Sequence, residues 1–247
     1  MKLIQNKTKI LLITIIVVGL ILRFWKINIP LLEFQPSRQI QTAEITKNLF
    51  LYNLNILQPT VTYLGPGKTP FILEFPGYNF IVSLIYFGTG NVSEIYGRFF
   101  SILGWILGVL FLFKIAEELV GERSALIAAL FYTISPISVL VSRSFQPDQW
   151  MLTFSLGSLY CFIRYESRKN LRLFILSAFL ASIYALLKMP SLIFTVFPII
   201  LFILFFRENK KIVYSFIYLS ISIALPASWY IYAFVINKQG LSTEGAF

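Results

Sequence analysis

Three acidic side chains lie where they could do chemistry in this chain of 247 residues, which has only eleven carboxylates. Glu33 and Glu74 belong to one long polar stretch between apolar runs, and Asp148 is the sole aspartate. Since histidine is absent, the usual general base near neutral pH is missing, and a carboxylate is left as the candidate for that role. A carboxylate that accepts a proton in a transition state contributes roughly 10²- to 10⁴-fold in rate.

The two most prominent acids also have a structural interpretation. Glu74 lies just before Pro76, so it could cap a helix that the proline opens. Asp148 follows Pro147 and precedes another apolar run, so it could cap the helix that this run forms. A carboxylate at a helix N-terminus is stabilised by roughly 0.3 to 1 kcal/mol. Capping and catalysis therefore both remain open for these two residues.

Cations and amides accompany the acids. Arg38, Gln39 and Gln41 lie in the polar stretch, and we expect them to face its central acid. Arg143 precedes Asp148 by five residues across a predicted turn, where it could pair with the aspartate or bind a phosphate through two N–H groups. A cation at the edge of a membrane costs free energy, which favours a functional role for Arg143.

The composition is that of a membrane protein. Hydrophobic residues make up 57% of the chain and charged residues 13%, with a mean hydropathy of +0.76, whereas soluble domains carry roughly 25% charged residues. The net charge of +10 gathers in short loops between apolar runs, so it indicates membrane topology rather than nucleic-acid binding. The single cysteine, Cys161, excludes an internal disulfide.

The first part of the chain predicts one span and a polar loop. Residues 10–22 are apolar and follow three lysines, with no small-residue cleavage site after them, so we predict a retained span with the N-terminus in the cytoplasm. An amphipathic pattern over 37–54 predicts a helix on the membrane surface. Pro76 opens a short apolar helix that reaches only 87–88, about half of the roughly 20 residues that a crossing needs. Residues 30–94 should form an outer loop with interfacial helices.

Six more apolar runs complete the predicted fold, an all-α bundle of about seven membrane spans. They cover residues 95–114, 125–141, 149–163, 172–187, 189–206 and 212–236. With the N-terminus inside, the inner loops hold most lysines and arginines, and the outer turns around Arg143 and Lys188 hold one each. This topology brings the outer loop, these two turns and the C-terminal tail to one face of the membrane.

Several segments, taken in order along the chain, carry a resemblance to a known family. They read AEITKNLF at 43–50, EFPGYNFIVSLIYFG at 74–88, the apolar run at 98–136 and SRSFQPDQWM at 142–151. In this order the chain resembles the GT-C membrane glycosyltransferases, specifically the group of the protein O-mannosyltransferases and the lipid A aminoarabinose transferase. The resemblance covers most of the chain, and the order of the motifs carries it.

The resemblance implies transfer of a sugar from a polyprenyl monophosphate donor to a lipid, glycan or protein acceptor on the outer side of the cell membrane. A carboxylate would take the proton of the acceptor hydroxyl, and cations or a divalent metal would hold the departing lipid phosphate. Matched by position, Glu74 falls on the acid before the family's proline and Tyr78 on its aromatic residue. Arg143 and Asp148 fall on its arginine and aspartate ahead of a span.

The chain departs from the family pattern at the expected base. An Asp-Glu pair common in relatives falls on Arg38 and Gln39, and the aspartate of another branch falls on Gln41. The resemblance therefore leaves two alternatives: Glu33, Glu74 or Asp148 substitutes for the missing aspartate, or the chain is catalytically impaired.

Two further departures concern a lysine and the length. The resemblance implies a lysine where Phe75 stands, and Lys68 is the candidate to replace it. The family's proteins are longer, with more spans, so the chain is expected to be the N-terminal half of such a protein, a truncated or split protein, or a subunit that depends on a partner. The rival classes are a small transporter and a non-catalytic membrane subunit. Transporters tend to place ionisable groups near the midplane, whereas the charges here lie at helix ends.

Overall fold

The computed structural model describes residues 2–62, 69–205 and 211–238. The described part is mostly helical, which confirms the all-α prediction. Among the described residues the strands are limited to a two-residue antiparallel ladder, in which β1 (Thr60–Val61) pairs with β2 (Thr69–Pro70). Lys68 lies outside the described residues, so its predicted role is not addressed by the structure.

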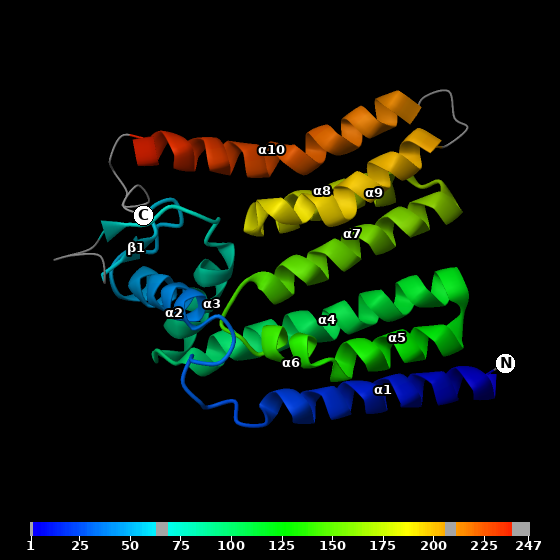
Figure 1. Ribbon diagram of the computed structural model, residues 1–247, viewed down its shortest axis with the longest axis horizontal. Helices are drawn as coiled ribbons and strands as arrows, with labels where there is room; N and C mark the ends of the chain where they lie inside the picture. The colour runs from blue at the N-terminus through cyan, green and yellow to red at the C-terminus, as the bar shows by residue number, and fades with distance from the viewer. Residues whose placement is uncertain (1, 63–68, 206–210, 239–247) are drawn as a thin grey trace.

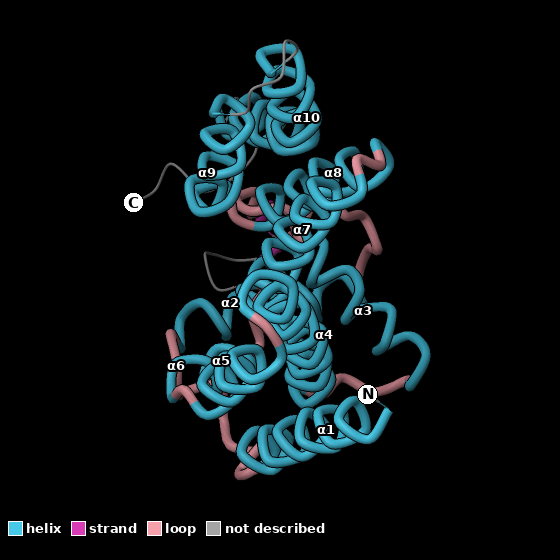
Figure 2. The backbone as a smooth tube through the Cα atoms, turned by 90° about the vertical axis from the view of Figure 1, so that its right-hand side faces the viewer, coloured by secondary structure: helices cyan, strands magenta, loops and turns pink. Residues whose placement is uncertain are grey.

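Long helices lie side by side with roughly aligned axes and form the body of the molecule (Figure 1). They are α1 (Lys2–Phe24), α4 (Glu94–Val120), α7 (Asp148–Arg168), α8 (Leu171–Leu187), α9 (Leu192–Phe205) and α10 (Lys211–Lys238). Seen end-on in Figure 2, α1 lies at one edge and α9 and α10 lie at the other. The close pairings of α4 with α7, α7 with α8, and α8 with α10 connect the two edges.

A smaller region covers one end of this bundle (Figure 1). It contains α2 (Pro36–Leu51), α3 (Gly77–Thr89) and the two short strands. The predicted surface helix corresponds to α2 and the predicted short helix to α3, which has 13 residues and is too short to cross a bilayer. This region lies against the C-terminal end of α1, the N-terminal end of α4 and the C-terminal end of α10 (Figure 1).

The run predicted as one span over 125–141 is broken. It consists of α5 (Glu122–Ile134) and α6 (Pro136–Ser142), which are bent by 65° relative to each other. Pro136 explains the break, because its ring removes a backbone N–H and prevents a straight helix from continuing. A 3-10 turn (Met189–Ser191) likewise precedes α9, where the sequence predicted one helix from 189.

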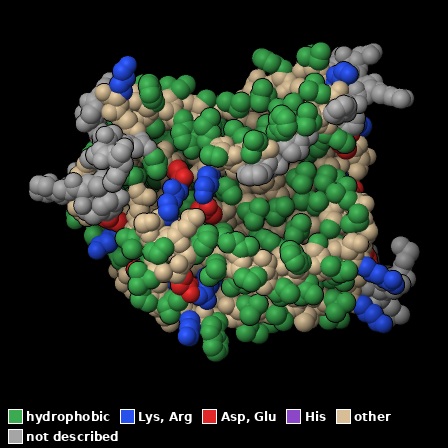
Figure 3. Space-filling view, viewed as in Figure 1, with side chains coloured by type: hydrophobic (Ala, Val, Ile, Leu, Met, Phe, Trp, Pro, Cys, Tyr) green, Lys and Arg blue, Asp and Glu red, His purple; other side chains and the backbone are tan. Residues whose placement is uncertain are grey.

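Helix length and composition do not by themselves show seven crossings. Within the described residues, α4 and α10 are long and apolar enough to cross a membrane, and the bent pair α5–α6 is a third if it counts as one span. Exposed apolar side chains nevertheless cover much of the long-helix body, while charged groups gather toward its ends (Figure 3). This distribution suits a body that contacts lipid.

Glycine allows the turn before α7 to approach α4. A Cβ atom added at Gly97 would lie 2.3 Å from the ring of Phe145, which no real side-chain contact allows. The buried Phe145 ring also packs with Tyr78 and Val82 of α3 in one apolar cluster. The turn 143–148 is thereby fixed between the bundle and the smaller region, and this turn leads into Asp148.

Candidate functional site

Glu74 and Arg38 form an ion pair at the covered end of the bundle. Arg38 lies in the first turn of α2, and its Nη2 donates to both carboxylate oxygens of Glu74 at 2.8 and 2.7 Å. Glu74 lies just before the N-terminus of α3, where no side chain caps the helix, so the capping interpretation is not observed. Burial alone would lower the pKa of Arg38, but the hydrogen bond and charge of Glu74 and the charge of Asp148 raise it above its ordinary value.

Asp148 and Lys188 form a second ion pair. Asp148 is the first residue of α7, and Lys188 directly follows α8. The Lys188 Nζ donates to Asp148 Oδ1 at 2.5 Å, while Asp148 Oδ2 is buried and has no hydrogen-bond partner among the described atoms. Asp148 does not cap α7 with its side chain. The free oxygen leaves the aspartate one acceptor site for a bound molecule.

The two pairs lie near each other, since Pro147, directly before Asp148, lines one pocket together with Arg38 and Glu74. On the face shown in Figure 3, red and blue groups gather where the smaller region meets the long helices. A small pocket of about 40 Å³, partly open to solvent, adjoins them. Its lining combines α2, the loop before β1, the segment before α3, α3 itself and the turn before α7. The lining residues are Arg38, Gln41, Thr42, Ile45, Pro59, Phe71, Leu73, Glu74, Phe75, Pro76, Asn79 and Pro147.

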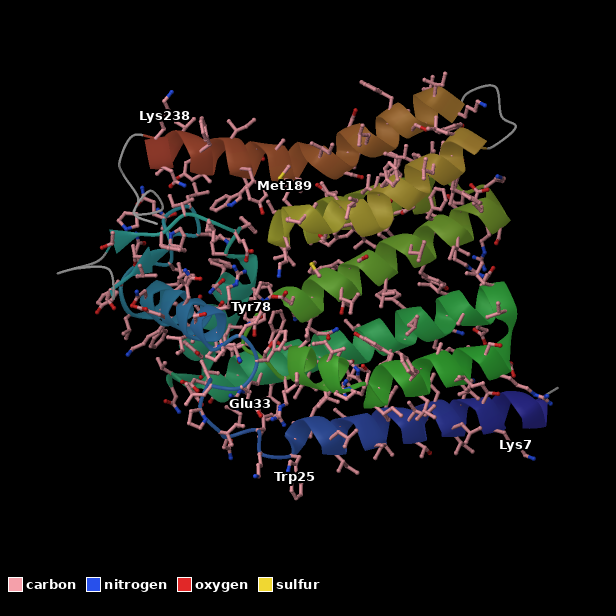
Figure 4. The ribbon with its side chains drawn as sticks, viewed as in Figure 1. Lys7, Trp25, Glu33, Tyr78, Met189 and Lys238 are labelled. Carbon is pink, nitrogen blue, oxygen red and sulfur yellow. The ribbon has the colours of Figure 1, made fainter. Side chains whose placement is uncertain are left out.

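Arg143 binds Glu33 rather than Asp148. Its guanidinium forms an ion pair with Glu33 Oε1 and donates to the Trp25 carbonyl oxygen at 2.7 Å. Figure 4 shows Glu33 and Trp25 near the end of α1. Of the two partners that the sequence left open for Arg143, the aspartate is therefore not the one it contacts. Glu33 and Arg143 form a pair of their own and do not line the pocket beside Glu74.

Gln39 and Tyr78 are held inside the protein. Gln39 donates from Nε2 to the Phe34 carbonyl at 2.6 Å and accepts from the Phe145 N–H at 2.9 Å, so it ties the loop before α2 to the turn before α7. The Tyr78 hydroxyl donates to the Gly97 carbonyl at 2.7 Å, and burial raises the pKa of Tyr78 well above its ordinary value. Gln41 lines the pocket. Binding of substrate by these three residues remains a prediction.

Sequence reasoning missed Lys188 as a site residue, although a signal was present. The lysine is one of only two basic residues assigned to the outer turns of the predicted topology, where the positive-inside rule disfavours it. The sequence does not predict that Lys188 pairs with Asp148, because this contact depends on how α7 and α8 pack. The two helices form the most extensive pairing in the described structure.

Arg23 was missed as well, and it is fully buried. The guanidinium donates to the hydroxyls of Ser138 and Ser142 and to the carbonyls of Gly19 and Thr133 at 2.6 to 3.1 Å. It also lies 3.6 Å from the centroid of the Trp105 ring. Thr133 precedes the break at Pro136, so Arg23 satisfies a carbonyl that the interrupted helix leaves free.

Arg23 thereby supports α6, which leads directly into the turn carrying Arg143 and Asp148. In the sequence it reads only as the charged end of the first apolar run. A fully buried arginine whose partners are hydroxyls, carbonyls and a ring, rather than a carboxylate, marks a position where the backbone arrangement matters.

A divalent metal does not have an evident ligand set here. Among the described residues, no three acidic, histidine or cysteine side chains converge on one point. Glu74 and Asp148 each accept from a cation instead. The arrangement can bind an anion through two cations and can accept a proton on a carboxylate.

Comparisons with known proteins identify the family of the chain. The model of the dolichyl-phosphate-mannose-protein mannosyltransferase family matches residues 69–232, which include Glu74, Asp148 and Lys188. An uncharacterized protein of Aquifex aeolicus (strain VF5) is 29% identical over 163 residues, which cover 64% of this chain and 32% of that relative. The match thus spans about a third of the relative's length. Since the family model covers more than half of the chain, the protein belongs to the dolichyl-phosphate-mannose-protein mannosyltransferase family of membrane glycosyltransferases.

Proposed function

We propose that this protein is a membrane glycosyltransferase that transfers a sugar from a polyprenyl-phosphate donor to an acceptor at the outer side of the cell membrane. One observation carries the proposal. Two acids and two cations from four separate parts of the chain, Glu74, Asp148, Arg38 and Lys188, meet at one end of an apolar bundle. A phosphate at the end of a long hydrocarbon chain needs this combination of an apolar surface and cations at its edge.

The proposed topology has about seven crossings, with α5 and α6 together forming one of them. Helices α7 and α8 have 21 and 17 residues, close to the roughly 20 that a crossing needs. The ends of the helices away from the site carry most of the basic residues, such as Arg164, Arg168 and Arg172. This asymmetry supports a topology in which those ends lie in the cytoplasm together with the N-terminus and the site lies on the outer side.

The donor phosphate would bind to Arg38 and Lys188. A guanidinium can offer two parallel N–H groups to phosphate oxygens, and an ammonium offers a point charge. Both cations now donate to carboxylates, so phosphate binding would exchange those hydrogen bonds and free Glu74 and Asp148. In this scheme the donor itself releases the base, and an acceptor hydroxyl has no proton acceptor until the donor is in place.

Sugar transfer then proceeds in one displacement. The acceptor oxygen attacks the anomeric carbon, its proton passes to the Glu74 carboxylate, and the bond from that carbon to the phosphate oxygen breaks. The electron pair leaves with the phosphate, whose growing negative charge Arg38 and Lys188 stabilise. Glu74 is the better candidate for the base because it lines the solvent-open pocket, while Asp148 has one buried oxygen that can receive a hydrogen bond from the sugar.

A second candidate is a subunit that binds the lipid phosphate without catalysis. The observation in its favour is the ion pairing itself, since both acids near the pocket are occupied by cations. The family's expected aspartate is also replaced by Arg38, Gln39 or Gln41 in the alternative alignments. Such a subunit would bind polyprenyl phosphate and transfer no sugar.

The test uses the complete protein in lipid nanodiscs with radiolabelled polyprenyl-phosphate sugars, mannose first. Glu74→Gln should lower transfer by about 10²- to 10⁴-fold while donor binding persists, because only proton acceptance is lost. Glu94→Gln is the matched control, since this acid in the first turn of α4 is not among the residues lining the pocket. Full activity of Glu74→Gln would remove the residue from the mechanism. Donor binding with no transfer by the unmodified protein, across acceptors, would favour the second candidate.

A further inference from the structure

The C-terminal half of α10 contacts the segment that carries Glu74, although the two are far apart in sequence. Trp229 donates from Nε1 to the Leu73 carbonyl at 3.2 Å, and Asn237 donates from Nδ2 to the Ile72 carbonyl at 3.2 Å. Figure 1 shows this end of α10 beside the smaller region. The residues immediately before Glu74 are therefore held by two side chains of one helix.

The residue after Glu74 is held from the same helix. The rings of Phe75 and Trp229 meet edge to face, with centroids 5.0 Å apart and planes at 83°. Such a contact contributes about 0.5 to 1.5 kcal/mol beyond the burial of area. Ile72, Trp229 and Ala233 belong to one buried apolar cluster, which Phe75 packs against. Glu74 thus lies between two neighbours that both depend on Trp229.

The spacing on α10 explains why one face can do this. Trp229, Ala233 and Asn237 follow one another at intervals of four residues, so they lie above one another on one side of the helix. The small side chain of Ala233 allows segment 71–76 to approach the helix. Trp229 and Asn237, one turn to either side, donate to the carbonyls of two consecutive residues of that segment. Segment 71–76 lies between β2 and α3 and has no regular helix or strand of its own. Its backbone position therefore depends on partners outside the segment.

We propose that Trp229 is a positioning residue for Glu74, holding its carboxylate at the pocket and within reach of Arg38. The inference rests on the proposed function, because it concerns the base of that reaction. Trp229 does not line the pocket and touches neither Arg38 nor Lys188 among the described contacts. It should affect the chemical step and leave donor binding nearly unchanged. A displacement of about 1 Å at a reacting group can cost on the order of 10²-fold in rate.

The test compares two side chains of α10 that donate hydrogen bonds to the loop, in the complete protein. Trp229→Phe removes the N–H donor and keeps a ring, and Trp229→Ala removes both. Tyr232→Phe is the matched control, since the Tyr232 hydroxyl donates to the Leu57 carbonyl at 3.0 Å in a different part of the loop. We expect kcat to fall about tenfold for Trp229→Phe and about 10²-fold for Trp229→Ala, with the donor KM within about twofold and Tyr232→Phe near wild type.

A double mutant separates positioning from a general loss of structure. If Trp229 acts through Glu74, Trp229→Phe should cause no further loss in a Glu74→Gln background. Hydrogen exchange should rise in segment 69–76 of Trp229→Phe and stay unchanged in α8. A multiplicative loss in the double mutant, or faster exchange throughout α8 and α10, would overturn the inference.

The outcomes also separate this inference from the proposed function. Full transfer by Glu74→Gln would refute the role of Glu74 and with it both proposals. Loss of transfer in Glu74→Gln together with full transfer in Trp229→Ala would refute the positioning role alone. The proposed reaction would then stand without Trp229.

Discussion

Replacement of Lys188 by methionine gives the sharpest test of the site, because the change removes a cation and retains most of the side-chain volume. In the structure Lys188 Nζ donates to Asp148 Oδ1 at 2.5 Å, and the side chains of the lysine and the aspartate are 31% and 14% exposed. Without the lysine, Asp148 keeps a partly buried charge with neither oxygen paired among the described contacts. The change should therefore affect both stability and donor binding.

The magnitude follows from the kind of bond and its exposure. A hydrogen bond to a charged group contributes about 1.5 to 3 kcal/mol, and partial exposure reduces this toward the value of a surface pair. We therefore expect Lys188→Met to lower the free energy of unfolding by about 1 to 2 kcal/mol. Loss of a phosphate-binding cation should also weaken binding of polyprenyl phosphate by about 10- to 100-fold, which corresponds to about 1.4 to 2.8 kcal/mol of binding free energy.

The assay pairs thermal unfolding in detergent with binding of polyprenyl phosphate to nanodiscs. Lys114→Met is the matched control, since Lys114 pairs with Glu117 at 2.7 Å but is 52% exposed and lies at the opposite end of the bundle. The control should change stability by at most about 0.5 kcal/mol and leave binding intact. The double mutant that combines Lys188→Met and Asp148→Asn should lose less stability than the two single mutants lose in total.

Two results would refute the reasoning about Lys188. Normal lipid binding by a destabilised Lys188→Met protein would restrict the lysine to a structural role. Stability equal to that of Lys114→Met would mean that the ion pair with Asp148 contributes nothing measurable to the fold.

Three other predictions concern the support of the site. Arg23→Lys should lower the midpoint of thermal unfolding by several degrees, because an ammonium cannot reach all four acceptors of the guanidinium; an unchanged midpoint would contradict the role of that residue at the helix break. Gly97→Ala should cost about 1 to 3 kcal/mol in unfolding free energy because its Cβ meets Phe145, whereas Gly88→Ala, with no atom within 4 Å of the added Cβ, should be tolerated. Arg38→Gln should weaken binding of polyprenyl phosphate at least tenfold in the nanodisc assay, and wild-type affinity would exclude it as a phosphate ligand.

The helices could be predicted closely from the sequence, because apolar runs bounded by charges and prolines give direct signals. The predicted runs 95–114 and 212–236 correspond to α4 and α10, and the proline at 76 marks the start of α3. The run over 125–141 was predicted as one span, and the 65° angle of its break at Pro136 depends on the packing of α6 against α1 and α4. The number of crossings depends on a bilayer, which helix length alone does not supply.

The site could be predicted only in part. Because the chain has few carboxylates, Glu74 and Asp148 could be identified as candidates from the sequence. The position of Arg38 in the same polar stretch predicted that it faces Glu74, and the structure contains this ion pair. The partner of Asp148 is set by the packing of α7 on α8, for which no local pattern in the sequence exists. The contact between Trp229 and the Leu73 carbonyl spans 156 positions, so it too depends on the whole fold.

The presence of two cations, Arg38 and Lys188, at the site has a kinetic consequence for the proposed reaction. A lipid phosphate that carries a sugar is a diester with one negative charge, whereas the spent carrier is a monoester with about −1.5 to −2 charges at neutral pH. Arg38 and Lys188 would attract the spent carrier more strongly than the loaded one. Departure of the used lipid, rather than bond cleavage, is then expected to limit turnover, and a build-up of free carrier in the bilayer should slow the enzyme.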